Sequence, residues 1–190
     1  MLHLEVPGGG NEVLLHSCCA PCSGAVLECL LANGIRPLVF FSNSNIVPRG
    51  EYDLRLSELR RYCDSLGVEL VEDEYDHEAW RSFVLEVPEL AAAPERGPRC
   101  LNCFKFRLKR AAEFAAARGI PVLTTTLASS RWKSLEQVSE AGAWACDNKI
   151  SFWPQNWRKG GLQERRSQII CEQNFYNQNW CGCEFSHRNP

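Results

Sequence analysis

Cysteine is the residue type that could carry chemistry in this chain, because 11 of its 190 residues are cysteine. Thiolates bind metals and attack electrophiles, whereas a disulfide scaffold is normally a short secreted chain with an even cysteine count. The odd count, the length and a first segment without a cationic or apolar leader predict a metal or redox site in a cytoplasmic protein. Seven of the cysteines form three tight groups: Cys18, Cys19 and Cys22; Cys100 and Cys103; Cys181 and Cys183.

The spacing within each group is suited to a shared centre. Cys19 and Cys22 follow a predicted strand and open a predicted helix, where free N–H groups and the helix dipole stabilise a thiolate. Their sulfurs would lie one helical turn apart on the same face. Cys100 and Cys103 repeat this spacing at the start of a basic helix. The third group is too short for a helical turn, and its central Gly182 allows both sulfurs to face one centre.

Seven thiols are more than one ordinary metal centre needs. Structural zinc and a 4Fe-4S cluster each take four ligands, so either would leave three thiols over. A division into four and three predicts a closed cluster and a second, open site for a metal or a dithiol. Such a division indicates electron transfer, which zinc cannot carry, so we favour iron–sulfur over zinc. The isolated cysteines are predicted to be small buried hydrophobes: Cys29, Cys63, Cys146 and Cys171.

Two basic segments predict an RNA-binding face. Residues 99–118 carry six cations against one acidic residue, and Lys105 and Lys109 are the candidate phosphate contacts. The segment Trp157-Arg158-Lys159 adds an aromatic ring on which a base could stack. The alternative for both segments is a solvated helix face with core tryptophans. Residues 69–78 are acidic, offset the cations in a net charge of −2, and are expected to form a solvated face away from the substrate.

Alternating strand and helix signals predict an α/β fold that positions these residues. A mostly parallel sheet with helices on both faces is expected, in one domain over residues 1–190. Its core would be residues 12–150, and a cysteine-rich extension at 151–190 would complete the site. Ligands bind beyond the carboxyl ends of such strands, where the first cysteines and residues 42–45 fall. The predicted strands are residues 13–15, 37–41, 68–71, 122–127 and 150–153, and the predicted helices are residues 51–66, 103–118, 134–145 and 162–173.

Six segments in chain order resemble the signatures of the cobalamin-independent epoxyqueuosine reductases, the QueH family. The resemblance runs from about Leu14 to Ser186, which is nearly the whole chain. The chain differs at Ser44, Trp132, Trp157 and Asn177, where the family has proline, tyrosine, phenylalanine and arginine. The six segments are Cys18-Cys19-Ala20-Pro21-Cys22, Asn43 to Pro48 with Glu51, Tyr52 and Arg55, Arg99 to Phe104 with Arg107 and Leu108, Thr125 to Leu127 with Ser130 to Lys133, Trp157 to Gly161, and Tyr176 to Ser186.

The resemblance implies a Rossmann-like fold of the HUP/PP-loop type and an oxidoreductase of queuosine biosynthesis. The implied reaction is the reductive deoxygenation of epoxyqueuosine to queuosine at the wobble position of tRNA. A 4Fe-4S cluster is implied, next to a second site that holds either a mononuclear iron or a redox-active disulfide. The expected cluster ligands are Cys18, Cys19, Cys100 and Cys103, with Cys22 able to replace one of the adjacent pair, and the expected second site is Cys22, Cys181 and Cys183.

Two other functions compete with this interpretation. A tRNA-thiolating enzyme of the PP-loop type should carry a Ser-Gly-Gly-x-Asp-Ser loop, but the chain has Cys19-Ala20-Pro21-Cys22-Ser23-Gly24 there. A zinc-stabilised RNA-binding module is the non-enzymatic alternative. The expected partners are tRNA and an unidentified electron donor, with no membrane and no DNA. The proton donor is left open among Glu51, Asp53, His16 and Asp147, whose default role is structural.

Overall fold

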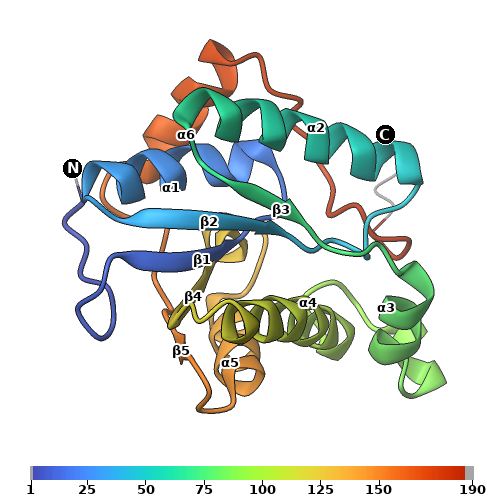
Figure 1. The fold of residues 1–190 in the computed structure, drawn as a ribbon. Helices are drawn as coiled ribbons and strands as arrows, with labels where there is room; N and C mark the ends of the chain where they lie inside the picture. Colours follow the sequence, from blue (N-terminus) through green and yellow to red (C-terminus); the bar gives the residue numbers. More distant parts are fainter. Residues whose placement is uncertain (1, 187–190) are drawn as a thin grey trace.

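Five parallel strands form one sheet in the order β3-β2-β1-β4-β5 (Figure 1). The computed structural model describes residues 2–186. Because β2 and β3 extend the sheet on one side of β1 while β4 and β5 extend it on the other, the order in which strands are added reverses at the boundary between β1 and β4. Such a reversal opens a crevice at the carboxyl ends of the two strands. The strands are β1 (Glu12–His16), β2 (Arg36–Phe41), β3 (Leu70–Glu72), β4 (Val122–Thr125) and β5 (Ser151–Phe152).

Helices cover both faces of the sheet (Figure 1). One face carries α1 (Ala20–Ala32), α2 (Arg49–Leu66) and α6 (Leu162–Glu172). The other face carries α4 (Pro98–Ala117) and α5 (Leu135–Cys146), with α3 (His77–Val84) beside the end of α4. Short 3₁₀ helices lie at Pro88–Ala92 and Thr126–Ser129. None of the helices within residues 2–186 has the length and apolar content needed to cross a membrane.

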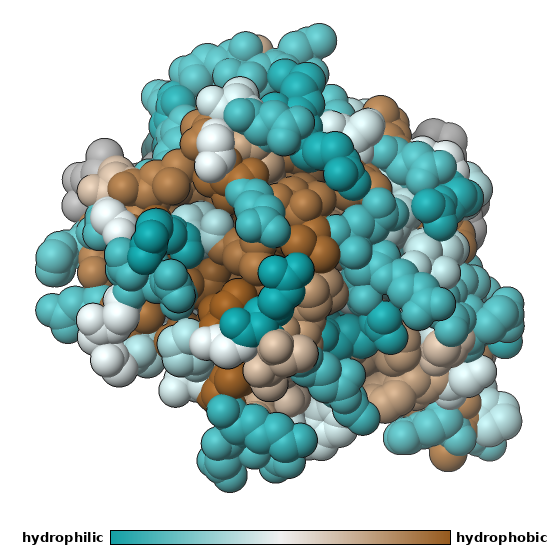
Figure 2. Space-filling model, in the orientation of Figure 1, coloured by the Kyte–Doolittle hydropathy of each residue, from teal (hydrophilic) through white to brown (hydrophobic). Residues whose placement is uncertain are grey.

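The strands are buried on both faces because alternate side chains point to opposite helix layers. Leu15 and Phe41 belong to the larger hydrophobic cluster, which includes residues of α1 and α2. Leu14, Phe40 and Leu123 face the other way and pack with small residues of α4. Each fully buried aliphatic side chain of this kind contributes about 1.5–3 kcal/mol. The space-filling view in Figure 2 has the orientation of Figure 1. On the side of the molecule that it shows, polar residues dominate the outer rim and hydrophobic residues gather toward the middle.

The sheet and the predicted helices are confirmed, with differences in extent at several boundaries. Helix α4 begins five residues before Cys103, because Pro98 occupies the start of a helix, where its missing N–H is not needed. Strand β4 ends at Thr125, whose side chain accepts a hydrogen bond from Leu127 N and starts a 3₁₀ turn. Strand β3 has only three residues, Leu70–Glu72.

Helix α3 was not predicted, and it begins at His77, at the end of the acidic stretch of residues 69–78. Asp76 caps this helix by accepting a hydrogen bond from Ala79 N, and Trp80 and Val84 are buried. The prediction of a solvated acidic face was wrong for Asp73, which is largely buried in an ion pair with Arg110. The prediction for the isolated cysteines holds for three of them, but Cys171 is exposed.

Candidate functional site

A cavity of about 330 Å³ lies beyond the carboxyl ends of β1, β2 and β4. Its wall includes residues that follow these strands, the first turn of α4 and the segment 177–186 near the end of the chain. The wall therefore joins the three cysteine groups, which are far apart in sequence. Six of the seven grouped cysteines line it, and all are free thiols: Cys18, Cys22, Cys100, Cys103, Cys181 and Cys183.

The first group sits where β1 passes into α1. Cys19 is the N-cap residue in an extended conformation, and Pro21 lies in the first turn of the helix. The sulfurs of Cys18, Cys19 and Cys22 all lie within 4.8 Å of one another, and the Cys18–Cys19 distance is 3.7 Å. Hydrogen bonds from the Cys19 and Cys22 thiols lower the pKa of Cys18 well below its ordinary value. Three converging sulfurs, one of them readily ionised, can hold a soft metal ion.

The second group lies in the first turn of α4, and backbone and side-chain N–H groups point at its sulfurs. Arg96 N donates to Cys100 Sγ at 3.3 Å, and Trp80 Nε1 donates to Cys103 Sγ at 3.3 Å. Burial raises the pKa of Cys103 to about 11 and also raises the pKa of Cys100. These N–H donors would stabilise negative charge on sulfur once a metal displaces the protons.

The third group is held in a tight bend at Gly182, which has a φ of +101°. A β-carbon at this position would lie 3.1 Å from the guanidinium of Arg55 and from Ile46, so only glycine fits. A hydrogen bond from the Cys183 thiol, followed by the cations nearby, lowers the pKa of Cys181. The bend therefore presents one readily ionised sulfur and one sulfur that keeps its proton.

A buried arginine of α2 ties the third group to the rest of the molecule. Arg55 is only 3% exposed and pairs with Glu51 at 2.5 Å, while its Nη1 donates to the main-chain oxygen of Cys181 at 3.0 Å. Val47 N donates to the Gly182 oxygen at 2.8 Å. Glu51, one of the proton-donor candidates, is committed to this ion pair and also accepts from the Tyr176 hydroxyl at 3.2 Å.

The other three proton-donor candidates do not line the cavity. Asp53 forms an exposed ion pair with Arg49, and Asp147 ends α5 in the left-handed region with a φ of +41°. His16 is fully buried, and burial followed by the charge of Arg107 lowers its pKa to about 3, so it is neutral. The contacts of all three residues therefore fit a structural role rather than that of the proton donor.

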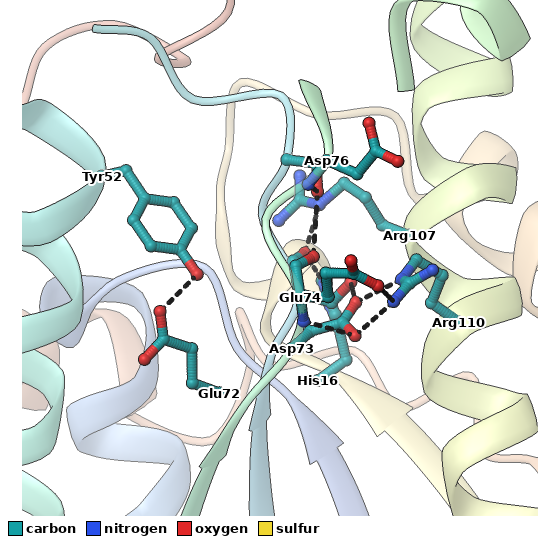
Figure 3. A network of polar contacts seen from close by, with 10 residues as sticks. His16, Tyr52, Glu72, Asp73, Glu74, Asp76, Arg107 and Arg110 are labelled. Carbon is teal, nitrogen blue, oxygen red and sulfur yellow. Dashed lines mark hydrogen bonds and ion pairs between the residues drawn. The ribbon is translucent and has the colours of Figure 1, made fainter. Parts of the chain in front are cut away.

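His16 belongs to a polar network that fixes the carboxyl ends of the strands (Figure 3). Its Nε2 lies 3.2 Å from the Ser42 oxygen, which can only accept, so Nε2 carries the proton. Its Nδ1 then accepts from the Thr125 hydroxyl at 2.8 Å. Arg107 donates from Nε to the same Ser42 oxygen at 3.2 Å. The network joins β1, β2 and β4 to helix α4, just beneath the cavity.

A neighbouring ion pair extends the network to the end of β3 (Figure 3). Asp73 accepts from the Ser42 hydroxyl at 2.6 Å and from Arg110 Nη2 at 2.7 Å. The Tyr52 hydroxyl donates to Glu72 at 3.0 Å. Ser42 begins the loop after β2 that carries the cavity-lining asparagines. Its main-chain oxygen is held by His16 and Arg107, and its hydroxyl is held by Asp73.

Two cations in the cavity wall were not singled out by sequence reasoning, although both fall within the quoted segments. Arg107 is buried, and its other nitrogen Nη2 donates to the Asn43 side-chain oxygen. Burial opposes a charge on Lys133, but the neighbouring Cys181, Cys18 and Cys22 raise its pKa above the ordinary value. The positive charge among the thiols arises from folding, because residues 18–22, 107, 133 and 181 meet only in three dimensions.

The five predicted tRNA contacts do not form one exposed group. Trp157 is fully buried and offers no ring face to a base in this structure, as the alternative of a core tryptophan anticipated. Arg158 donates to the main-chain oxygens of Ser130 and, at 2.7 Å, of Lys133, so it supports the loop that carries Lys133. Lys105 is ion-paired with Glu140 at 3.3 Å on the side of α5. Lys109 and Lys159 are exposed.

The comparisons with known proteins agree on one family. The sequence model of the family described as Epoxyqueuosine reductase QueH matches residues 13–189. A protein of that name from Haemophilus influenzae is 41% identical over 188 residues, which cover 98% of this chain and 76% of the relative. A second, from Thermotoga maritima, is 32% identical over 178 residues, which cover 93% of this chain and 90% of the relative. The chain thus belongs to the epoxyqueuosine reductase QueH family, and the thiol-lined cavity is its candidate active site.

Proposed function

We propose that this protein reduces epoxyqueuosine in tRNA to queuosine and that the reaction takes place in the thiol-lined cavity. The observation that carries the proposal is the convergence of three distant cysteine groups on one cavity, in a chain that belongs to the family named for this reaction. A cytoplasmic location follows from a tRNA substrate. The electron donor is a second partner, which the chain's own residues do not identify.

The reaction requires a source of electrons and a source of protons. Conversion of an epoxide to an alkene consumes two electrons and two protons and releases the oxygen as water. Oxidation of Cys181 and Cys183 to a disulfide would release two electrons and two protons, which balances this demand. An external donor must then reduce the disulfide again.

The donor set fits an iron–sulfur cluster, because thiols at two helix N-termini converge and N–H groups donate to two of the sulfurs. In this proposal Cys18, Cys19, Cys100 and Cys103 hold a 4Fe-4S cluster, and Cys22 can replace one of the adjacent pair. When bound, the cluster supplies electrons one at a time. Cys22, Cys181 and Cys183 form the second site, either as a redox dithiol or around a mononuclear iron.

A different division of the cysteines has its own support. Cys103 and Cys183 share an apolar cluster with Trp80 and Val84. The charge of Cys181 also raises the pKa of both Cys100 and Cys103. In this second division the cysteines of α4 and of the third group are the four ligands, and the first group is the open site.

The cavity cations have roles that do not depend on this division. Lys133 Nζ is a charged group among the thiols, suited to stabilising negative charge on the oxygen that leaves the epoxide. Arg107 is hydrogen-bonded to the strand ends and stabilises negative charge on the thiols and on that oxygen. Binding of tRNA relies on exposed cations, with Lys109 and Lys159 the strongest of the original candidates.

The test is turnover by the anaerobically reconstituted protein. The protein is given tRNA that carries epoxyqueuosine and a chemical reductant, and the tRNA is then digested to nucleosides for mass spectrometry. The proposal predicts conversion to queuosine by loss of one oxygen atom. Iron-loaded protein that binds this tRNA but leaves the epoxide intact would contradict it. Zinc in place of iron would favour the RNA-binding module.

A further inference from the structure

The cavity wall contains polar atoms that the described residues leave without partners. Apart from Arg55, whose Nη2 pairs with Glu51, four residues of the wall each have a buried side-chain atom without a hydrogen-bond partner within residues 2–186: Asn45 Oδ1, Gln137 Oε1, Gln178 Oε1 and Arg166 Nε. Native proteins rarely leave such atoms unsatisfied, so each one calls for a partner beyond the described residues, such as a ligand or an ordered water. Three of the four are amide oxygens. The cavity is therefore suited to a ligand rich in N–H and O–H donors.

Gln137 is the best defined of these acceptors. Its Nε2 donates to the main-chain oxygen of Arg96 at 2.8 Å, which fixes the orientation of the amide. Its backbone N–H donates to Ser134 Oγ, the cap of α5. Because both the backbone and the amide nitrogen are held, Oε1 is left as a preorganised acceptor on a residue of the cavity wall.

An exposed aromatic ring lies in the same part of the wall. Trp132 lines the cavity and is 51% exposed, although it is a large hydrophobic residue. Arg96 connects it to Gln137, because Arg96 Nε donates to the Trp132 oxygen at 2.9 Å while the Arg96 oxygen accepts from Gln137. The guanidinium of Arg131 lies 4.9 Å from the centre of the Trp132 ring. An indole beside cations at a cavity wall is a stacking platform for an unpaired base.

We propose that Trp132 and Gln137 form the subsite for the nucleobase of the substrate. The indole stacks on the 7-deazaguanine ring, and Gln137 Oε1 accepts hydrogen bonds from the N–H groups on its Watson–Crick edge. Enzymes that act on a nucleotide within a nucleic acid commonly extrude it and read it by these two kinds of contact. The inference rests on the proposed function, since it takes epoxyqueuosine as the ligand.

Binding measurements test the acceptor without any turnover. Holoprotein is titrated with anticodon stem-loop RNAs that carry guanosine or inosine at the wobble position, because inosine lacks only the 2-amino donor. The wild type should prefer guanosine by about 5- to 10-fold, as one hydrogen bond predicts. Gln137→Leu should bind both RNAs equally, with thermal unfolding confirming that it is folded. An unchanged preference in a folded Gln137→Leu variant would overturn the acceptor role.

Kinetics with epoxyqueuosine-containing tRNA test the stacking. Trp132→Ala should raise KM by about 5- to 150-fold, the range for loss of one stacked base, whereas Trp132→Phe should stay within about threefold of the wild type. Trp144→Ala is the matched control, because Trp144 is 45% exposed but lies outside the cavity wall. A Trp132→Ala variant with wild-type KM would overturn the subsite. Failure of the wild type to reduce the epoxide would instead refute the proposed function. The guanosine and inosine binding measurements on wild type and Gln137→Leu would still show whether Gln137 belongs to a nucleobase subsite.

Discussion

The first and third cysteine groups reach the same cavity but are held by different means. Cys18 to Cys22 lie where a central strand passes into a helix, so the hydrogen bonds of the sheet and α1 fix their backbone. The third group follows the end of α6 at Glu172, in a segment without helix or strand up to residue 186. The first group is therefore preorganised by the core, and the third depends on contacts that single side chains provide.

The contacts of the third group reach three helices. Arg55 of α2 binds the Cys181 oxygen, Arg81 of α3 pairs with Glu184 at 3.2 Å, and the guanidinium of Arg99 in α4 lies 4.4 Å from the centre of the Phe185 ring. Each such contact contributes only about 1 kcal/mol. Segments held in this way open at a lower free energy than core elements. The difference suggests that the third group closes the cavity after a nucleoside enters.

The largest effect is expected from a change in the preorganised group. Cys18→Ser should lose bound iron and sulfide and reduce turnover at least about 100-fold, since a metal ligand matters more than its supporting contacts. Cys171→Ser is the control, because Cys171 is exposed and lies outside the cavity wall. Metal and sulfide analysis measures both. Full iron content in Cys18→Ser would remove the first group from the cluster.

The next largest effect is expected from the clamp on the third group, which is the hydrogen bond from Arg55 to the Cys181 oxygen. Arg55→Leu alone leaves Glu51 buried without its ion-pair partner, which costs about 3–5 kcal/mol and obscures the result. The double variant Arg55→Leu/Glu51→Leu removes both charges. It should keep its iron and lose about 10- to 100-fold in kcat, the range for a supporting contact.

Hydrogen exchange separates this clamp from a general loss of stability. Amides of residues 181–186 should exchange faster in the double variant, while those of β1 and α1 should keep wild-type protection. Equal acceleration in both regions would mean that Arg55 supports the whole fold rather than the third group.

A smaller effect is expected for the exposed cations. Lys109→Glu and Lys159→Glu should each weaken tRNA binding several-fold and reduce the slope of log Kd against log salt by about 1. Arg36→Glu is the matched charge reversal, since Arg36 is an exposed cation at the amino end of β2 and lies outside the cavity wall. Equal losses in all three variants would show that net charge, rather than a binding face, controls affinity.

The smallest effect is expected from the salt bridge that joins α1 to α6. Arg165 lowers the pKa of Glu28, so this pair stabilises the fold above the ordinary glutamate pKa of about 4.3 and loses its effect as the pH falls through the lowered value. Glu28→Gln should cost no more than about 1 kcal/mol at pH 7, because both side chains are about one-third exposed. Denaturant unfolding at pH 7 and pH 3 checks this, and turnover should not change. If the free energies of unfolding of the wild type and Glu28→Gln differed more at pH 3 than at pH 7, the pKa of Glu28 would be raised rather than lowered in the folded protein.

Much of this architecture could be predicted from local sequence patterns. Strand and helix periodicity predicted the sheet and its main helices, and cysteine spacing predicted two helix starts. Helix α3 was missed because it is short and follows acidic residues. Its buried Trp80 donates a hydrogen bond to Cys103, a contact that exists only in the folded chain. An aromatic residue beside cations fits a binding face and a core equally well, which is why Trp157 was ambiguous. The clamp by Arg55 could not be predicted, because it joins residues 126 positions apart.

The most direct test of this account is the Cys183→Ser variant, prepared anaerobically and compared with the wild type for iron, sulfide, absorption spectrum and turnover. If the third group acts separately from the cluster, the variant keeps its iron, sulfide and cluster spectrum, and epoxide reduction falls to background. Loss of the cluster itself would show that Cys183 is one of its ligands. That result would contradict the proposed division into four and three and favour a cluster held by the cysteines of α4 and the third group.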